Sequence, residues 1–304
     1  MVDVAAGRLY VVATPIGNLG DMSARARDTL QSCGLIAAED TRHTGVLLKA
    51  FGITTQQVSL HEHNEAARAQ DIVGRLRAGV SVALVSDAGT PAISDPGFDV
   101  VRAAADAGIE VVTIPGPCAA IAALSIGALP TDRFCFEGFL PARAGARRQR
   151  LAGLAAESCT LVFYESPHRI KGTLEDCVQA FGEGRAASVV REATKLHETV
   201  YRGTLGELRE RAARDPDFRR GEIVLLVGGA PQGGAPHRGA VQSGAGEGAP
   251  GAEGDGHGGR LDAVLKALMA ELPLKQAARL AAQITAARDN EAYKRALFLK
   301  SAVP

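Results

Sequence analysis

The sequence predicts two α/β domains followed by a small helical module, and three features support this prediction. The chain has 304 residues, more than one hydrophobic core usually holds, so about two domains are expected. Short apolar, β-branched runs alternate with longer helical patterns, as in a mainly parallel α/β sheet. A Gly-rich segment at 231–259 then separates these patterns from the C-terminal residues.

The first domain is predicted over residues 1–118. Its strands are expected at 9–13, 35–38, 80–86 and 110–114, where apolar and β-branched residues gather. Ser23 and Asn64 precede helical patterns and are placed as N-caps of two of the intervening helices, the first of which runs to Ser32.

The second domain is predicted over residues 119–230. Strands are expected at 133–138, 160–164, 187–191, 199–203 and 222–227. Helices are expected to begin near Pro167 and Thr204. Several of these strands follow one another with little helix between them, which favours a mixed sheet and hence a separate domain.

Residues 231–259 are predicted to be a flexible linker. This stretch holds eleven glycines in 29 positions and no Leu, Ile or Phe, so it cannot bury enough apolar area to offset its ordering entropy.

A helical C-terminal module is predicted over 260–304. Its expected apolar stripes are Leu261, Val264, Leu265 and Leu268, then Leu280, Ile284 and Ala287, with Asn290 capping a last helix that contains Tyr293, Ala296 and Leu297. Eight Lys or Arg against four Asp or Glu make the module basic. Contact with RNA and an ordinary solvated basic face both remain open for it.

Composition indicates a soluble globular protein. Lys plus Arg and Asp plus Glu are both 34, so any nucleic-acid contact must use local patches and not a whole-molecule field. The five cysteines are widely spread with no C-x-x-C pair, which is typical of reduced thiols and predicts no metal site. No apolar run is long enough to span a bilayer and no signal-peptide pattern is present, so a cytoplasmic location without membrane contact is expected.

Three Gly- and Pro-rich loops follow predicted strands of the first domain, at 14–21, 85–97 and 114–120. Such loops let backbone groups approach a ligand closely at the carboxyl ends of strands. Each loop alone is also compatible with a tight strand-to-helix turn, and the G-x-G-x-x-G dinucleotide spacing is absent. Three of them after three strands are expected to converge on one crevice.

Six segments together resemble the tetrapyrrole-methylase superfamily, the class III methyltransferases, and within it the branch that methylates small-subunit ribosomal RNA. They read VATPIGNLGD, AAEDTRHTG, LVSDAGTPAISDPG, IPGPCAAIAAL, LVFYESPHRI and VVREATKLHE. The resemblance covers about residues 8–230 and recurs in the tail KQAARLAAQITAARDNEAYKRAL. It implies methylation of a cytidine 2′-hydroxyl in 16S ribosomal RNA and a homodimer.

The resemblance also implies that S-adenosylmethionine, the methyl donor, binds in a cleft between the two α/β domains. The positions that match donor contacts are Pro15, Ile16, Gly17, Asp87, Ala88, Gly89, Thr90, Ile93, Cys118, Ala119, Glu165 and Ala193. Ile16 and Thr90 depart from the porphyrin-modifying relatives, which carry Pro and Asp there.

A base is expected in the strip Glu39-Asp40-Thr41-Arg42-His43, directly after the second strand. A ribose hydroxyl is a poor nucleophile at neutral pH, so a carboxylate that removes its proton helps. Asp40 or Glu39 is predicted as this base, with Arg42 and His43 gripping phosphate or orienting the base. A purely structural pair of Glu39 and Arg42 is the alternative.

Three functions remain at this stage: an RNA ribose methyltransferase, a porphyrinoid C-methyltransferase and a non-catalytic RNA-binding module. The segment 141–150 holds four arginines and no acid, which favours phosphate contact over a solvated helix start. A porphyrinoid enzyme needs neither this segment nor a basic tail, and a binding module does not need three Gly/Pro loops. The first function is therefore predicted.

Overall fold

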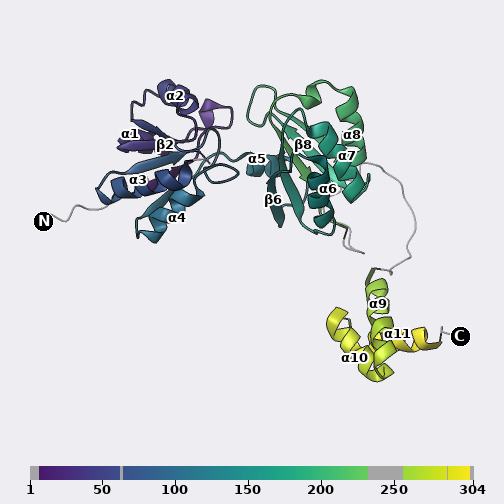
Figure 1. The fold of residues 1–304 in the computed structure, drawn as a ribbon. Coiled ribbons are helices and arrows are strands. Elements are labelled where there is room, and N and C mark those ends of the chain that lie inside the picture. The colour runs from purple at the N-terminus through teal and green to yellow at the C-terminus, as the bar shows by residue number, and fades with distance from the viewer. Residues whose placement is uncertain (1–6, 62–63, 232–255, 286, 302–304) are drawn as a thin grey trace. The chain divides into compact units, whose positions relative to one another are not determined.

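The computed structural model describes residues 7–61, 64–231, 256–285 and 287–301 (Figure 1). The chain forms two compact units, Met1–Ala230 and Pro231–Pro304. Most of the predicted linker, residues 232–255, lies outside the described residues. Among the helices that are described, none is long and apolar enough to cross a membrane.

The first sheet is parallel throughout and has the order β3-β2-β4-β1-β5. Its strands are β1 (Leu9–Val12), β2 (Leu35–Ala38), β3 (Gln57–Ser59), β4 (Val82–Val85) and β5 (Val111–Ile114). β2 and β4 are buried along their whole length, as expected for strands with helices on both faces. Because all five strands are parallel, the loops after β1, β4 and β5 leave from the same edge.

Helices cover both faces of this sheet (Figure 1). They are α1 (Ala24–Ser32), α2 (Thr41–Ala50), α3 (Glu65–Arg77) and α4 (Phe98–Asp106), with a short 3-10 turn at Leu19–Asp21. One core joins α3 and α4 to alternate strand residues, and a second joins α1 and α2 to the others. The Ser23 cap is confirmed, because its Oγ accepts from the Ala26 N–H at 3.1 Å. Asn64 does precede α3, but its side chain accepts from the His61 N–H and makes no cap hydrogen bond.

The second sheet is mixed, as predicted, with the order β6-β7-β10-β8-β9. Its strands are β6 (Phe134–Phe139), β7 (Thr160–Glu165), β8 (Ala186–Arg191), β9 (Thr199–Thr204) and β10 (Ile223–Val227). Only β6 and β7 are parallel neighbours.

Four helices and a 3-10 turn surround the second sheet. They are α5 (Ala119–Ile126), α6 (Ala144–Gly153), α7 (Ile170–Phe181), α8 (Leu205–Arg214) and the turn Asp217–Arg219. α6, α7 and α8 share one core with the sheet, and α5 packs on the other face. Thr204 starts α8 with a complete capping box to Glu207, and α7 begins at Ile170, three residues after the predicted Pro167.

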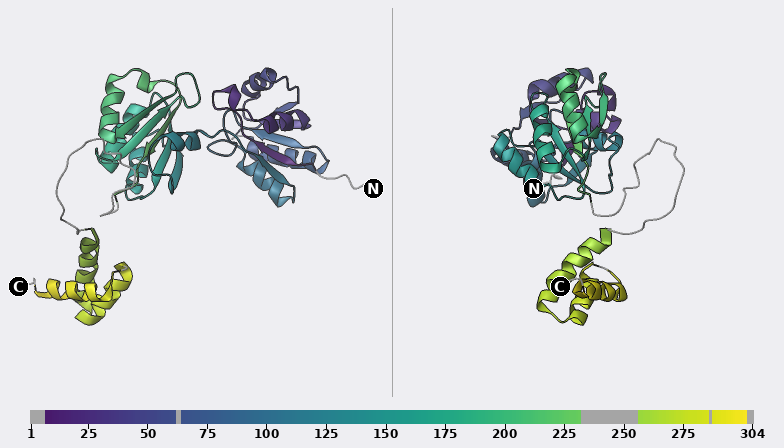
Figure 2. Two further views of the ribbon diagram at one scale, coloured as in Figure 1. Left: turned by 180° about the vertical axis from the view of Figure 1, so that it is seen from behind. Right: turned by 90° about the vertical axis from the view of Figure 1, so that its right-hand side faces the viewer.

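The C-terminal unit consists of α9 (Gly256–Glu271), α10 (Leu274–Thr285) and α11 (Asp289–Ser301), which pack against one another (Figure 2). α9 begins four residues before the predicted start of the module. α10 buries the alanine face Ala277, Ala278, Ala281 and Ala282 and leaves Ile284 53% exposed, so the predicted stripe through Leu280 and Ile284 is wrong. Small residues let helices approach closely, which explains why the alanine face of α10 packs against the neighbouring helices. The predicted cap Asn290 lies within α11.

Candidate functional site

The first two Gly/Pro loops are joined by backbone hydrogen bonds. The Thr14 N–H donates to the Gly89 carbonyl at 2.8 Å, and the Gly89 N–H returns a bond to the Thr14 carbonyl at 3.1 Å. The Thr14 hydroxyl also reaches the Ser86 carbonyl at 3.4 Å. Gly89 has a φ of 87°, in the left-handed region that favours glycine.

The third loop joins the other two. The Thr90 hydroxyl donates to the Pro117 carbonyl at 3.1 Å, and the Ala13 N–H donates to the Ile114 carbonyl at 3.2 Å. Gly116 lies so close to Ala13 that an added Cβ would be 3.0 Å from the Ala13 Cβ. The predicted convergence of the three loops is therefore present in the structure.

These loops form one wall of a cavity of about 320 Å³. The predicted donor contacts that line it are Ile16, Ala88, Gly89, Thr90, Ile93, Cys118, Ala119, Glu165 and Ala193. The opposite wall comes from the second sheet and its loops, including Phe139, Tyr164 and Val224. The volume of the cavity lies in the range of small-molecule sites, and most of the cavity lining is apolar.

Three predicted donor contacts do not line this cavity: Pro15, Gly17 and Asp87. Pro15 and Gly17 flank Ile16 in the chain. The side chain of Lys195 covers Gly17, leaving no room for a Cβ there. Asp87 turns toward the predicted catalytic strip, where its Oδ1 accepts from the Asp40 N–H at 3.0 Å.

Glu165 is buried and fully paired at the end of β7. Its Oε1 accepts from the Ser166 N–H at 2.8 Å and faces Arg169 Nε at 3.3 Å. Its Oε2 accepts from the Thr173 hydroxyl at 2.5 Å. These contacts fix the cavity wall at the point where β7 meets α7.

Tyr164 connects the cavity wall to the start of α5. Its hydroxyl accepts from the Ala120 N–H at 3.3 Å, one of the N–H groups that the first turn of a helix leaves unpaired. Its ring meets Phe136 and Phe139 edge-on, with centroids 5.0 and 5.6 Å away. Burial raises the pKa of the Tyr164 phenol well above its usual value, so the group stays protonated.

The strip Glu39–His43 does not line the cavity but is linked to it. The Glu39 Oε2 accepts from the Asp87 N–H at 3.3 Å, and Asp87 precedes the cavity residue Ala88. The strip therefore lies one residue from the cavity wall.

Asp40 is engaged by Arg42. Its Oδ1 caps α2 by accepting from the Arg42 N–H at 2.8 Å, and its Oδ2 accepts from the Arg42 guanidinium at 2.7 Å. The hydrogen bonds from Arg42 hold the pKa of the Asp40 carboxyl well below its usual value. The Arg42 side chain is 91% exposed, and His43 is exposed beside it.

Asp95 is a cavity residue that the site prediction missed. It lies in the same loop as Ala88 and Gly89 and is half-buried in the cavity wall. Burial raises the pKa of its carboxyl, and the neighbouring Asp87 adds to this, against a hydrogen bond with Ser86. The signal in the sequence was the second Asp of the loop 85–97, in which the predicted site stopped at Ile93.

The loop around Asp95 has an unusual backbone. Ala92 and Ser94 have φ values of 68° and 63°, a region that residues with a Cβ rarely occupy outside constrained sites. Two residues of the loop that carries Asp95 are thus kept in a costly backbone conformation.

The arginine-rich segment is divided between structural and exposed side chains. Arg147 is buried and its Nε donates to Asp176 at 2.7 Å, while Arg150 bonds Glu137 at 2.9 Å. Arg143 and Arg148 are exposed. Arg148 Nη1 also lies 3.8 Å from Asp176 Oδ1. Three of the four arginines that the sequence favoured for phosphate contact therefore form ion pairs within the protein.

Two family models match the chain. The family described as Tetrapyrrole (Corrin/Porphyrin) Methylases matches residues 8–209. The RsmI C-terminal HTH domain matches residues 255–300.

Curated relatives match nearly the whole chain. A "Ribosomal RNA small subunit methyltransferase I" of Escherichia coli O157:H7 is 48% identical over 295 residues, which are 97% of this chain and 96% of the relative. A protein of the same name from Pseudomonas aeruginosa is 49% identical over 296 residues, 97% of this chain and 98% of the relative.

Solved structures share the fold. Uroporphyrin-III-C-methyltransferase from Thermus thermophilus aligns with a TM-score of 0.53 and 21% identity over 73% of this chain and 94% of that one. The methyltransferase CobJ aligns with a TM-score of 0.55 and 21% identity over 74% and 95%.

Proposed function

The chain belongs to the tetrapyrrole methylase family, and on that premise we propose that it methylates the ribose 2′-hydroxyl of a cytidine in 16S ribosomal RNA, with S-adenosylmethionine as donor. The name of its relatives supports small-subunit ribosomal RNA as the substrate. The observation that carries the proposal is the single cavity on which nine of the twelve predicted donor contacts meet. Likeness to the porphyrin-modifying enzymes is limited to the fold, so a tetrapyrrole substrate is not favoured.

The residues of the cavity fit a nucleoside donor. Ala88, Gly89, Ala119 and Ala193 line it with small side chains or none, so backbone groups are accessible to a ligand. When bound, the donor supplies an electrophilic methyl group. The apolar walls exclude water and hold the reacting groups in line, which accounts for much of the rate gain in such a displacement.

Two places are proposed for the carboxylate that takes the ribose proton. The strip Glu39–Asp40 was the expectation, but the lowered pKa of Asp40 makes that group a weak base. Asp95 lies in the cavity wall and has a raised pKa, so we favour it as the base. The strip then holds Arg42 and His43 toward an RNA phosphate.

RNA binding is proposed for groups around the cavity and in the C-terminal unit. Arg42 and Arg143 have exposed side chains, and phosphate contacts position RNA without reading its sequence. A homodimer in the cytoplasm is also proposed, from the superfamily resemblance. Sedimentation of the purified protein checks the dimer.

Incubation with labelled donor tests the proposed function. We expect 30S particles to acquire label on one cytidine ribose, and a porphyrinoid offered in parallel to acquire none. Label on the porphyrinoid alone would reverse the assignment.

A variant comparison tests the assignment of the base. If Asp40 is an anchor for Arg42, Asp40→Asn raises KM for the particle and leaves kcat nearly intact. A steep fall in kcat with unchanged donor affinity would return the role of base to Asp40.

A further inference from the structure

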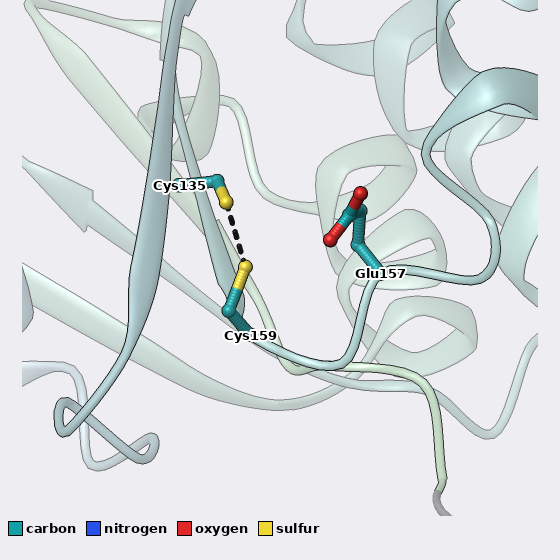
Figure 3. A group of neighbouring side chains, drawn as sticks. All are labelled: Cys135, Glu157 and Cys159. Carbon is teal, nitrogen blue, oxygen red and sulfur yellow. Dashed lines mark hydrogen bonds between the residues drawn. The ribbon is translucent and has the colours of Figure 1, made fainter.

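Two cysteines that are 24 residues apart in the sequence meet at the end of the second sheet (Figure 3). Cys135 lies on β6, and Cys159 directly precedes β7. The parallel register pairs Cys135 with Leu161, so Cys135 and Cys159 are diagonal neighbours on one face of the sheet. Their Sγ atoms are 2.8 Å apart.

A carboxylate completes the group. Glu157 lies on the turn before β7, and its carboxylate oxygen and the two sulfur atoms all lie within 4.8 Å of one another (Figure 3). The backbone of this turn is fixed, since the Glu157 N–H donates to the Leu154 carbonyl at 3.1 Å and its carbonyl accepts from the Ala230 N–H at 2.6 Å. The Glu157 side chain is exposed and Cys135 is half-buried, so the group is open to solvent.

The electrostatic surroundings of the thiols are negative. A hydrogen bond with Cys159, burial, and the charges of Glu157 and Glu137 all raise the pKa of Cys135, to about 11. The negative charges of Glu157 and Glu137 attract a divalent cation to this place.

We propose that Cys135, Cys159 and Glu157 form a binding site for a thiophilic divalent cation, with Zn²⁺ as the fitting ion. Two thiolates and a carboxylate are ligands that Zn²⁺ prefers. Binding releases the two thiol protons and forms two metal–sulfur bonds, and no electron is transferred. Water takes the fourth position of the tetrahedron.

The geometry requires a small adjustment. Zn–S bonds of about 2.3 Å in a tetrahedron separate the sulfur atoms by about 3.8 Å, so the Sγ atoms must move apart by roughly 1 Å. Rotation of the half-buried Cys135 side chain permits this. The ion would tie the turn before β7 to β6, beside Ala230, the last residue of the first unit. This site does not rest on the proposed methylation.

Titration of the full-length, tag-free, reduced protein with Co²⁺ tests the site. Thiolate ligation of Co²⁺ gives a charge-transfer band in the near ultraviolet, which histidine ligation elsewhere in the chain does not give. We expect one equivalent to produce the band, Zn²⁺ to abolish it by displacement, and Zn²⁺ to raise Tm.

Three variants make the test specific. Cys135→Ser should remove the band and the rise in Tm, whereas Cys33→Ser, which removes a buried cysteine directly after α1, should keep both. The exposed Glu157→Gln variant should keep the band but weaken binding by at least about tenfold. Absence of the band in the reduced parent protein, or its persistence in Cys135→Ser, would each overturn the proposal.

Discussion

Asp95 and Asp40 carry the same side chain, and their surroundings shift their pKa values in opposite directions. Burial in the cavity wall disfavours the charged form of Asp95, whereas hydrogen bonds from Arg42 favour the charged form of Asp40. A proton acceptor needs a pKa near the working pH, and an anchor for arginine needs a permanent charge. The two residues therefore suit different tasks.

The first prediction is that Asp95→Asn lowers the rate of methyl transfer. Loss of a general base typically costs 10²- to 10⁴-fold, so single-turnover methylation of 30S particles should slow by about 100-fold or more. Calorimetry should find donor affinity nearly unchanged, because the amide preserves the shape of the wall. Asp106→Asn, on the exposed end of α4, is the control. A rate within a fewfold of the parent would exclude Asp95 as the base.

The second prediction concerns stability against pH. The pKa of Asp95 is higher in the folded than in the unfolded protein. Asp95 therefore does not lower the free energy of unfolding below the unfolded-state pKa of about 3.9, and it lowers this free energy as pH rises through the folded-state pKa. Asp95→Asn should therefore raise Tm at pH 7, and the gain should fade on acidification. Asp40→Asn should do the opposite, because the lowered pKa of Asp40 stabilises the fold above about pH 3.9. Melting curves at pH 7 check both signs, and curves down to pH 4 follow the Asp95 effect.

At the scale of the element, the second Gly/Pro loop is fixed by backbone conformation. Gly89 has a φ of 87°, lines the cavity and pairs with Thr14, whereas Gly108 has a φ of 69° and open space where a Cβ would stand. Alanine costs about 1–2 kcal/mol of backbone strain at either position.

The third prediction follows from this pair of glycines. Gly89→Ala should weaken donor binding by at least about tenfold, because the strained loop relaxes away from the ligand-binding conformation, a shift of about 1.4 kcal/mol. Gly108→Ala should lose stability and keep its donor affinity. Calorimetric titration with the donor measures both. Equal affinities in the two variants would mean that this loop does not contact the donor.

The fourth prediction separates the buried Arg147 of α6 from the exposed Arg143, which directly precedes this helix. Arg147 and Asp176 are a buried pair, with side chains 10% and 6% exposed. Removing one partner of such a pair typically costs about 3–5 kcal/mol, so Arg147→Ala should lower the free energy of unfolding by that order. Arg143→Ala should leave stability almost unchanged and weaken RNA binding, measured by filter retention. Equal stability of the two variants would contradict the structural role of Arg147.

The elements show what the sequence was able to predict. Apolar runs located nine of the ten strands of the described residues, and the missed one, β3, is short and begins and ends with polar residues. Loops that directly follow strands were assigned correctly to one crevice, because parallel neighbours end at a common edge. Contacts that depend on register or on side-chain direction were not predictable, as with the pair Cys135 and Cys159 or the buried alanines of α10.

At the scale of the whole molecule, charge is balanced and the two units have separate cores. The first unit holds the cavity and four apolar clusters, and α9–α11 share a fifth. With zero formal net charge, no overall field attracts RNA, so affinity must come from local basic groups. The C-terminal helices supply such groups without lining the cavity.

A chain truncated after Pro231 tests whether the first unit binds the donor while the C-terminal unit contributes to RNA binding. Because the first unit has its own cores and the whole cavity, we expect the truncated chain to fold and to bind the donor with an affinity within about threefold of the parent. Loss of the basic helices should raise KM for 30S particles by at least about tenfold at physiological salt. The difference between the two chains should narrow as salt is raised, because salt screens the additional phosphate contacts of the parent. Calorimetry and initial rates at several salt concentrations measure these quantities. An unchanged KM would show that the C-terminal unit does not bind the substrate. Lost donor affinity would show that donor binding also depends on the C-terminal unit.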